Sequence, residues 1–215
     1  LVFLGLAVSE RGLSVLQAMA AADLTSDADF NQLLGGLISE PVVVGVAIAF
    51  LAAVVPLIEE SVKSVSIWPV IQRRPSVSQA FLGGVLAGSG YALFESLLLA
   101  QPGADWVSSM VARAGTPLIH AFGTGLVSWG LIEAIVNRRP LRLLALYLTA
   151  VGFHGIWNFT ALAVALSGFS LEVGAGVISP AGAGLVALSG LLVLLSLSAV
   201  ALVGLVGLPR WLAKR

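Results

Sequence analysis

The sequence lacks cysteine and has few charged residues. With no cysteine among its 215 residues, the chain cannot form a disulfide, a thiolate metal site or a thiol nucleophile. Charged residues make up only 10% of the chain, against about 25% in an ordinary soluble domain. The formal net charge is +0, so no basic field indicates a nucleic-acid partner. The two deficits exclude thiol chemistry and argue against a soluble domain.

Apolar residues are abundant instead, at 58% of the chain with a mean hydropathy of +1.02. Since about 20 apolar residues cross a bilayer, we predict an all-α polytopic membrane protein with about six transmembrane helices, leaving room for interfacial helices. We expect one transmembrane domain over residues 1–215. The sequence begins at Leu1 rather than at methionine, so we expect a trimmed chain and interpret no missing signal. The expected spans cover residues 1–22, which Glu10 and Arg11 interrupt, and residues 37–71, 79–100, 117–136, 141–166 and 181–208.

Basic and acidic loops alternate along the chain, which predicts its orientation. Lys and Arg gather in the turns at 72–76 and 137–142 and in the tail at 210–215. The intervening segments 23–32, 101–115 and 167–180 carry Asp and Glu, against the single cation Arg113. Because Lys and Arg mark cytoplasmic loops, we expect the C-terminus in the cytoplasm, and the N-terminus as well if the first segment spans.

One polar motif stands inside the second apolar span. Glu59, Glu60 and Lys63 lie within the otherwise apolar run from Pro41 to Val70. Two carboxylates and an ammonium at membrane depth are costly unless each has a partner. On a helix Lys63 lies one turn after both acids and can pair with either. One acid is then free to point into the bundle, towards groups on other helices.

Four predicted spans place such groups at a similar depth. Counting about 1.5 Å per residue from the basic turns puts Glu60 and His154 roughly 18 Å above them. The same count puts Glu95 and Asn158 roughly 24 Å and His120 roughly 25 Å above the turns. In a core about 30 Å thick, all five lie between the midplane and the outer surface. Both histidines of the chain are in this layer. We therefore expect these side chains to converge.

Each of these side chains also has a structural explanation. Lys63 can neutralise one acid, Glu95 can reach the outer interface, and His120 can join two helices by a hydrogen bond. Trp157 is typical of packing or interfacial anchoring. Together, however, a carboxylate and a neutral imidazole can hold and deprotonate a water. A His N–H and an Asn amide on one helical face can donate to an oxyanion, so peptide hydrolysis needs no Ser or Cys.

The order of these motifs resembles the PrsW family of intramembrane proteases, which is related to the CAAX prenyl endopeptidase (ABI/CPBP) group. The resemblance is carried by Glu59-Glu60-x-x-Lys63, Phe94-Glu95, His120 and His154-x-x-Trp157-Asn158. The broader group has EExxxR and FxxxH where this chain has EExxK and Phe94-Glu95, which favours the PrsW branch.

The resemblance implies an intramembrane endopeptidase that cuts a single-span, anti-sigma-factor-like membrane protein on the outer side of a prokaryotic plasma membrane. Its catalytic residues would be Glu59 or Glu60 as the base, His120 beside the water, and His154 with Asn158 at the oxyanion. Lys63, Phe94, Glu95 and Trp157 would support them.

Two questions remain open at this point. We expect no cofactor, and HExxH is absent, but two histidines and an acid can also bind zinc, which Glu60, Glu95, His120 and His154 would then hold. The alternative function is a proton- or ion-coupled transporter that uses the same acids and imidazoles as a relay. We find no internal repeat that would favour a transporter.

Overall fold

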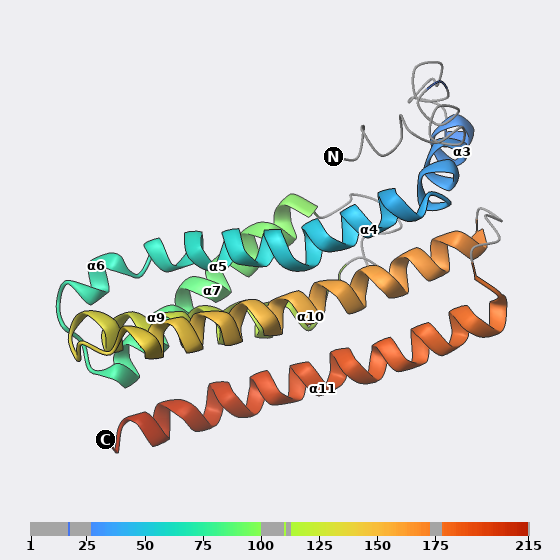
Figure 1. Cartoon of the computed structure of the whole chain (residues 1–215). Coiled ribbons are helices and arrows are strands. Elements are labelled where there is room, and N and C mark those ends of the chain that lie inside the picture. Colours follow the sequence, from blue (N-terminus) through green and yellow to red (C-terminus); the bar gives the residue numbers. More distant parts are fainter. Residues whose placement is uncertain (1–16, 18–26, 100–109, 111–112, 173–177, 215) are drawn as a thin grey trace. The chain divides into compact units, whose positions relative to one another are not determined.

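The computed structural model describes residues 17, 27–99, 110, 113–172 and 178–214. The described residues form helices and no strands. In chain order these are α3 (Asp27–Ile38), α4 (Pro41–Ala49), the π-helix η1 (Phe50–Val54), α5 (Val55–Val65), α6 (Trp68–Ile71), α7 (Val77–Leu99), α9 (Thr116–Ile135), α10 (Pro140–Glu172) and α11 (Pro180–Leu212) (Figure 1).

Five helical segments of this part of the chain are long and apolar enough to cross a membrane. They are Pro41–Val65, Val77–Leu99, Thr116–Ile135, Pro140–Phe169 and Pro180–Leu212. The prediction of an all-α polytopic membrane protein is confirmed. The expected first span at residues 1–22 and the expected loop at residues 101–115 lie largely outside the described residues.

Two segments predicted as loops are partly helical, and that prediction was wrong. Residues 23–32 were expected to be a loop, yet α3 begins at Asp27, and its apolar Leu33 is buried. Residues 167–180 were expected to be a loop as well, yet α10 continues to Glu172. In both places the helix includes short polar residues outside the apolar run, and such residues are also typical of loops.

The chain divides into two compact units. The first comprises Leu1–Ala52 and Asn158–Leu192, and the second comprises Ala53–Trp157 and Val193–Arg215. In the first unit, Asn158 Nδ2 donates to the carbonyl of Leu51 in η1 at 2.9 Å. A π-helix breaks the usual i→i+4 pairing, so a side-chain amide can take up one of its carbonyls. Pro56, which has no N–H to donate, is the second residue of the following helix α5.

In the second unit α7 and α9 lie side by side (Figure 1). A Cβ on Gly84 would meet the Thr124 carbonyl and Ser128, and a Cβ on Gly88 would meet the His120 carbonyl. The two glycines therefore let the backbones approach closely. The apolar core around this contact consists of Phe81, Ile119, Phe122, Leu126, Val127, Ala150, Trp157, Ala201 and Leu212.

The basic end of α9 contains a buried acid. Glu133, which the sequence suggests is an ordinary helix-end charge, is only 4% exposed. Its carboxylate accepts hydrogen bonds from Trp129, Asn137 and Arg142, the last at 2.9 Å. Asn137 lies in the turn between α9 and α10, and Arg142 lies in α10 itself, so Glu133 joins the two spans.

Candidate active site

The polar motif of α5 forms the centre of a buried cluster in the second unit. Lys63 Nζ donates to Glu60 Oε1 at 3.0 Å and lies 2.9 Å from Glu59 Oε2. The side chains of Glu60 and Lys63 are 0% and 1% exposed, whereas that of Glu59 is 17% exposed. Their i+3 and i+4 spacing on one helix brings both acids to the same ammonium.

His120 of α9 bridges Lys63 and Glu95. Its Nδ1 lies 2.7 Å from Lys63 Nζ, and its Nε2 lies 3.0 Å from Glu95 Oε2. An ammonium can only donate, so Nδ1 accepts, and the carboxylate can only accept while ionised, so Nε2–H donates. These partners assign His120 as the neutral Nε2–H tautomer.

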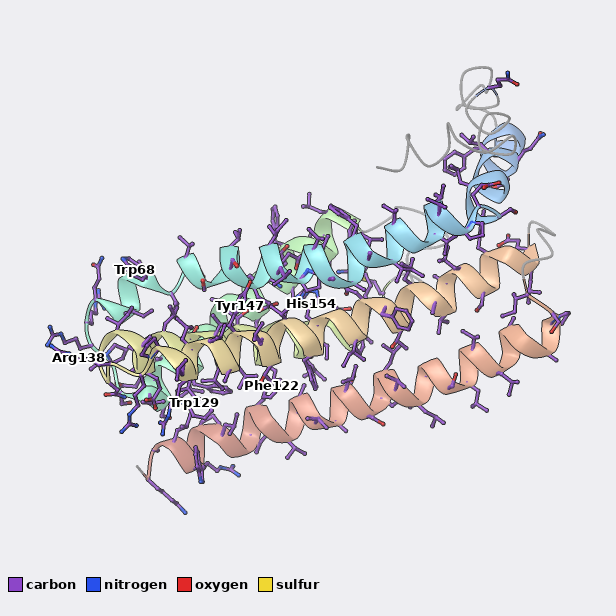
Figure 2. All side chains as sticks on the ribbon, viewed as in Figure 1. Trp68, Phe122, Trp129, Arg138, Tyr147 and His154 are labelled. Atoms are coloured by element: carbon purple, nitrogen blue, oxygen red, sulfur yellow. The ribbon has the colours of Figure 1, made fainter. Side chains whose placement is uncertain are left out.

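His154 of α10, labelled in Figure 2, lies close to the same two acids. Its Nδ1 lies 3.0 Å from Glu60 Oε1, so by the same reasoning Nδ1–H donates to the carboxylate. In the neutral imidazole Nε2 then carries a lone pair, and this atom lies 3.9 Å from Glu59 Oε2. The two imidazoles pack edge to face, with ring centroids 4.8 Å apart.

Two carboxylate oxygens in the cluster are buried and receive no hydrogen bond. They are Glu59 Oε2 and Glu60 Oε2. Glu59 Oε2 forms an ion pair with Lys63, but the geometry of this contact is not that of a hydrogen bond. A Cβ on Gly123 would lie 3.1 Å from Glu60 Oε2, so the absent side chain leaves room for this carboxylate. Unsatisfied buried oxygens favour a site that a water or a cation enters.

The structure thus brings together Glu59, Glu60, Lys63, Glu95, His120 and His154. Asn158 belongs to the other unit, where its amide donates to Leu51. Of the supporting residues, Phe94 is 60% exposed, and Trp157 is buried in the apolar core with its ring against Gly115.

Several neighbours of the cluster were missed from the sequence. Arg113 Nη2 donates to Glu95 Oε2 at 2.6 Å, and Arg113 lies in the segment 101–115, which was predicted only as a loop. The Tyr91 ring lies 4.3 Å from Lys63 Nζ and edge-on to His120. Tyr147, labelled in Figure 2, donates to the Leu57 carbonyl at 2.8 Å and so joins α10 to α5. In the sequence, Arg113 stood out only as the single cation of the segments 23–32, 101–115 and 167–180.

Three side chains in the described part of the chain could hold a metal ion. One ligand atom each from Glu59, His120 and His154 lie within 4.8 Å of one another. Two imidazoles and a carboxylate are a known ligand set for catalytic zinc, so the donor chemistry fits. The sequence had assigned Glu60 and Glu95 to zinc, but here Glu60 Oε1 binds Lys63 and His154, and Glu95 Oε2 binds Arg113 and His120.

Fold and site together define a class of protein: a multi-pass helical membrane protein with acids and imidazoles buried between its spans. A sequence profile described as PrsW family intramembrane metalloprotease matches residues 8–200. The chain therefore belongs to the PrsW family and is an intramembrane protease. Comparisons with the curated proteins and with the solved structures found no match.

Proposed function

We propose that the protein hydrolyses a peptide bond of a single-span membrane protein with a water activated by Glu59. The observation that supports this most is the pair Glu59 Oε2 and His154 Nε2, two acceptors 3.9 Å apart. A water between them can donate one hydrogen to each, which leaves its oxygen free to attack a carbonyl carbon. Glu59 is also the more exposed of the two acids.

Glu60 has a different task in this proposal. It is buried, and its Oε1 accepts from both Lys63 and His154. The hydrogen bond to Nδ1 keeps the lone pair of His154 on Nε2, towards Glu59. In this proposal Glu60 is therefore the positioning residue and Glu59 is the base. The sequence motif alone does not say which of the two acids has which role.

The reaction balances with these groups alone. The water oxygen bonds to the carbonyl carbon, and one of its protons passes to Glu59. As the C–N bond breaks, Glu59 returns that proton to the leaving amine, which yields a carboxylic acid and an amine. The family resemblance implies His154 and Asn158 at the oxyanion, but His154 donates its N–H to Glu60 here and has none left for that role. Asn158 keeps a second amide N–H beyond the one that it donates to Leu51.

A metal ion would use the same residues. Glu59, His120 and His154 would hold it, and it would supply Lewis-acid activation of the water. Without a metal, Lys63 provides positive charge beside Glu59. We favour the route without metal.

Substrate and orientation follow from the resemblance and from the basic turns. We propose an anti-sigma-factor-like substrate cut towards the outer leaflet of a prokaryotic plasma membrane. Arg73 and Arg74 lie before α7, and Arg138 and Arg139 before α10, which supports a cytoplasmic position for these turns. The alternative of an ion-coupled transporter has no comparable support.

The proposal is tested with the purified protein in liposomes, together with a panel of tagged single-span membrane proteins. Glu59→Gln should lower the cleavage rate at least ~100-fold, because the amide cannot take the proton. Ser64→Ala, which removes an exposed hydroxyl on the same helix, is the matched control and should cleave normally. Cleavage by Glu59→Gln at the rate of the control would refute the role of Glu59.

A further inference from the structure

Lys63 is the most completely partnered side chain of the cluster. Its ammonium has three N–H groups and three neighbours: Glu59 Oε2 at 2.9 Å, Glu60 Oε1 at 3.0 Å and His120 Nδ1 at 2.7 Å. The Tyr91 ring covers it further, at 4.3 Å. The ammonium is therefore held as a bound cation would be, by two carboxylates and an imidazole.

Two of these three neighbours are also candidate metal ligands. Glu59 and His120 belong to the group that could hold a metal, and His154 completes it. An ion bound to Glu59 Oε2 at about 2.2 Å could lie no further than about 5 Å from Lys63 Nζ. At this distance, inside a buried site, the repulsion between ammonium and metal is strong.

His120 makes the two cations mutually exclusive. Its Nε2 carries the proton that is donated to Glu95, so only the lone pair of Nδ1 could bind a metal. That single lone pair already accepts a hydrogen from Lys63. A metal can use His120 only if Lys63 first moves away, which would leave Glu60 without its ammonium.

We propose that Lys63 is the resident cation of the resting site and excludes divalent metal from Glu59, His120 and His154. It does so by occupying the lone pair of His120 and by its charge. This inference concerns the same site as the proposed function, and its importance for catalysis rests on that proposed function. Its test does not use proteolysis, so either can fail without the other.

The experiment measures zinc binding to the full chain in detergent micelles. After treatment with chelator, ZnCl₂ is titrated against a chromophoric competitor, and bound zinc per chain is counted by mass spectrometry. The wild type should bind no stoichiometric zinc. Lys63→Met, which keeps the apolar stem and removes the charge, should bind one zinc per chain on the order of 100-fold more tightly.

Two further variants identify the cause. Lys63→Arg keeps the positive charge and should resemble the wild type. Lys63→Met combined with His154→Ala should lose the gained affinity, because one of the three ligands is gone. Tight stoichiometric zinc in the wild type would overturn the proposal, and so would an unchanged affinity of a folded Lys63→Met. If Lys63→Met does not fold, Lys63→Gln takes its place, and the wild-type measurement remains decisive by itself.

Discussion

At the scale of single residues, Glu59 and Glu60 are chain neighbours with different surroundings. Adjacent helical residues point about 100° apart, so one acid can face the packed helices while the other faces an opening. Glu60 is buried and accepts hydrogen bonds from Lys63 and His154, whereas the side chain of Glu59 is 17% exposed. The two acids should therefore respond differently to the same substitution.

Glu60→Gln should destabilise the protein, while Glu59→Gln should not. Losing the charge of Glu60 leaves the buried Lys63 with weaker compensation, and breaking a buried ion pair costs about 3 kcal/mol or more. Glu59 is partly exposed and its loss leaves Lys63 paired with Glu60. Thermal unfolding in detergent measures both variants. Equal melting temperatures would contradict the division of roles.

Gly123→Ala should slow cleavage about 10-fold with little loss of stability. The added Cβ would lie 3.1 Å from Glu60 Oε2, so the carboxylate must move by a few tenths of an ångström and carry His154 with it. The steady-state cleavage rate is the measurement. Gly152→Ala, on α10 with open space around its Cβ, is the control. Equal rates for the two variants would show that the position of Glu60 is not critical.

Much of the cluster could be predicted because charge is rare in an apolar chain. A carboxylate or imidazole at membrane depth needs a partner, and counting along helices places Glu60, Glu95, His120 and His154 in one layer. The choice of partner could not be predicted, because it depends on how the helices rotate. Arg113 and Tyr91 were missed for this reason, as was the hydrogen bond between Asn158 and Leu51.

At the scale of elements, the spacing between α7 and α9 positions His120. Gly88 packs against the His120 carbonyl, where a Cβ would not fit. The position of His120 relative to α7 therefore depends on glycine at residue 88. The apolar runs predicted which segments form spans. They did not predict where the helices end, because α3 and α10 include polar residues. The π-helix before Pro56 could not be predicted from the sequence either.

Gly88→Ala should reduce both stability and cleavage, because its Cβ would collide with backbone that cannot rotate away. Separating α7 from α9 moves His120 away from Glu95 as well, and we expect at least a ~10-fold loss of rate. Gly90→Ala lies on the same helix in open space and should be nearly neutral. Thermal unfolding and cleavage are measured together. A neutral Gly88→Ala would show that this close approach is not needed.

At the scale of the whole molecule, the chain is an integral multi-pass membrane protein whose large apolar side chains are widely exposed. Examples are Leu86, Leu141 and Val203, each more than 70% exposed, as expected for surfaces that face lipid. The orientation of the spans decides whether the cluster opens towards the outer leaflet. Because the chain has no cysteine, single introduced cysteines can report this orientation cleanly.

Gln72→Cys should react with a membrane-impermeant maleimide only from the cytoplasmic side, and Ser179→Cys only from the outer side. The first residue lies in a basic turn and the second directly precedes α11. Labelling in intact cells and in inverted vesicles measures each side. The opposite pattern would place the cluster nearer the cytoplasmic leaflet and contradict outer-side cleavage.

The central claim is that helices far apart in sequence position Glu59 and His154 around one water. A double-mutant cycle tests it most directly, with cleavage rates for Glu59→Gln, His154→Ala and the combined variant. Residues that act on one water lose their effect together, so the double variant should be no slower than the slower single variant. If the two effects on the rate instead multiply independently, Glu59 and His154 do not share a water, and the account is contradicted.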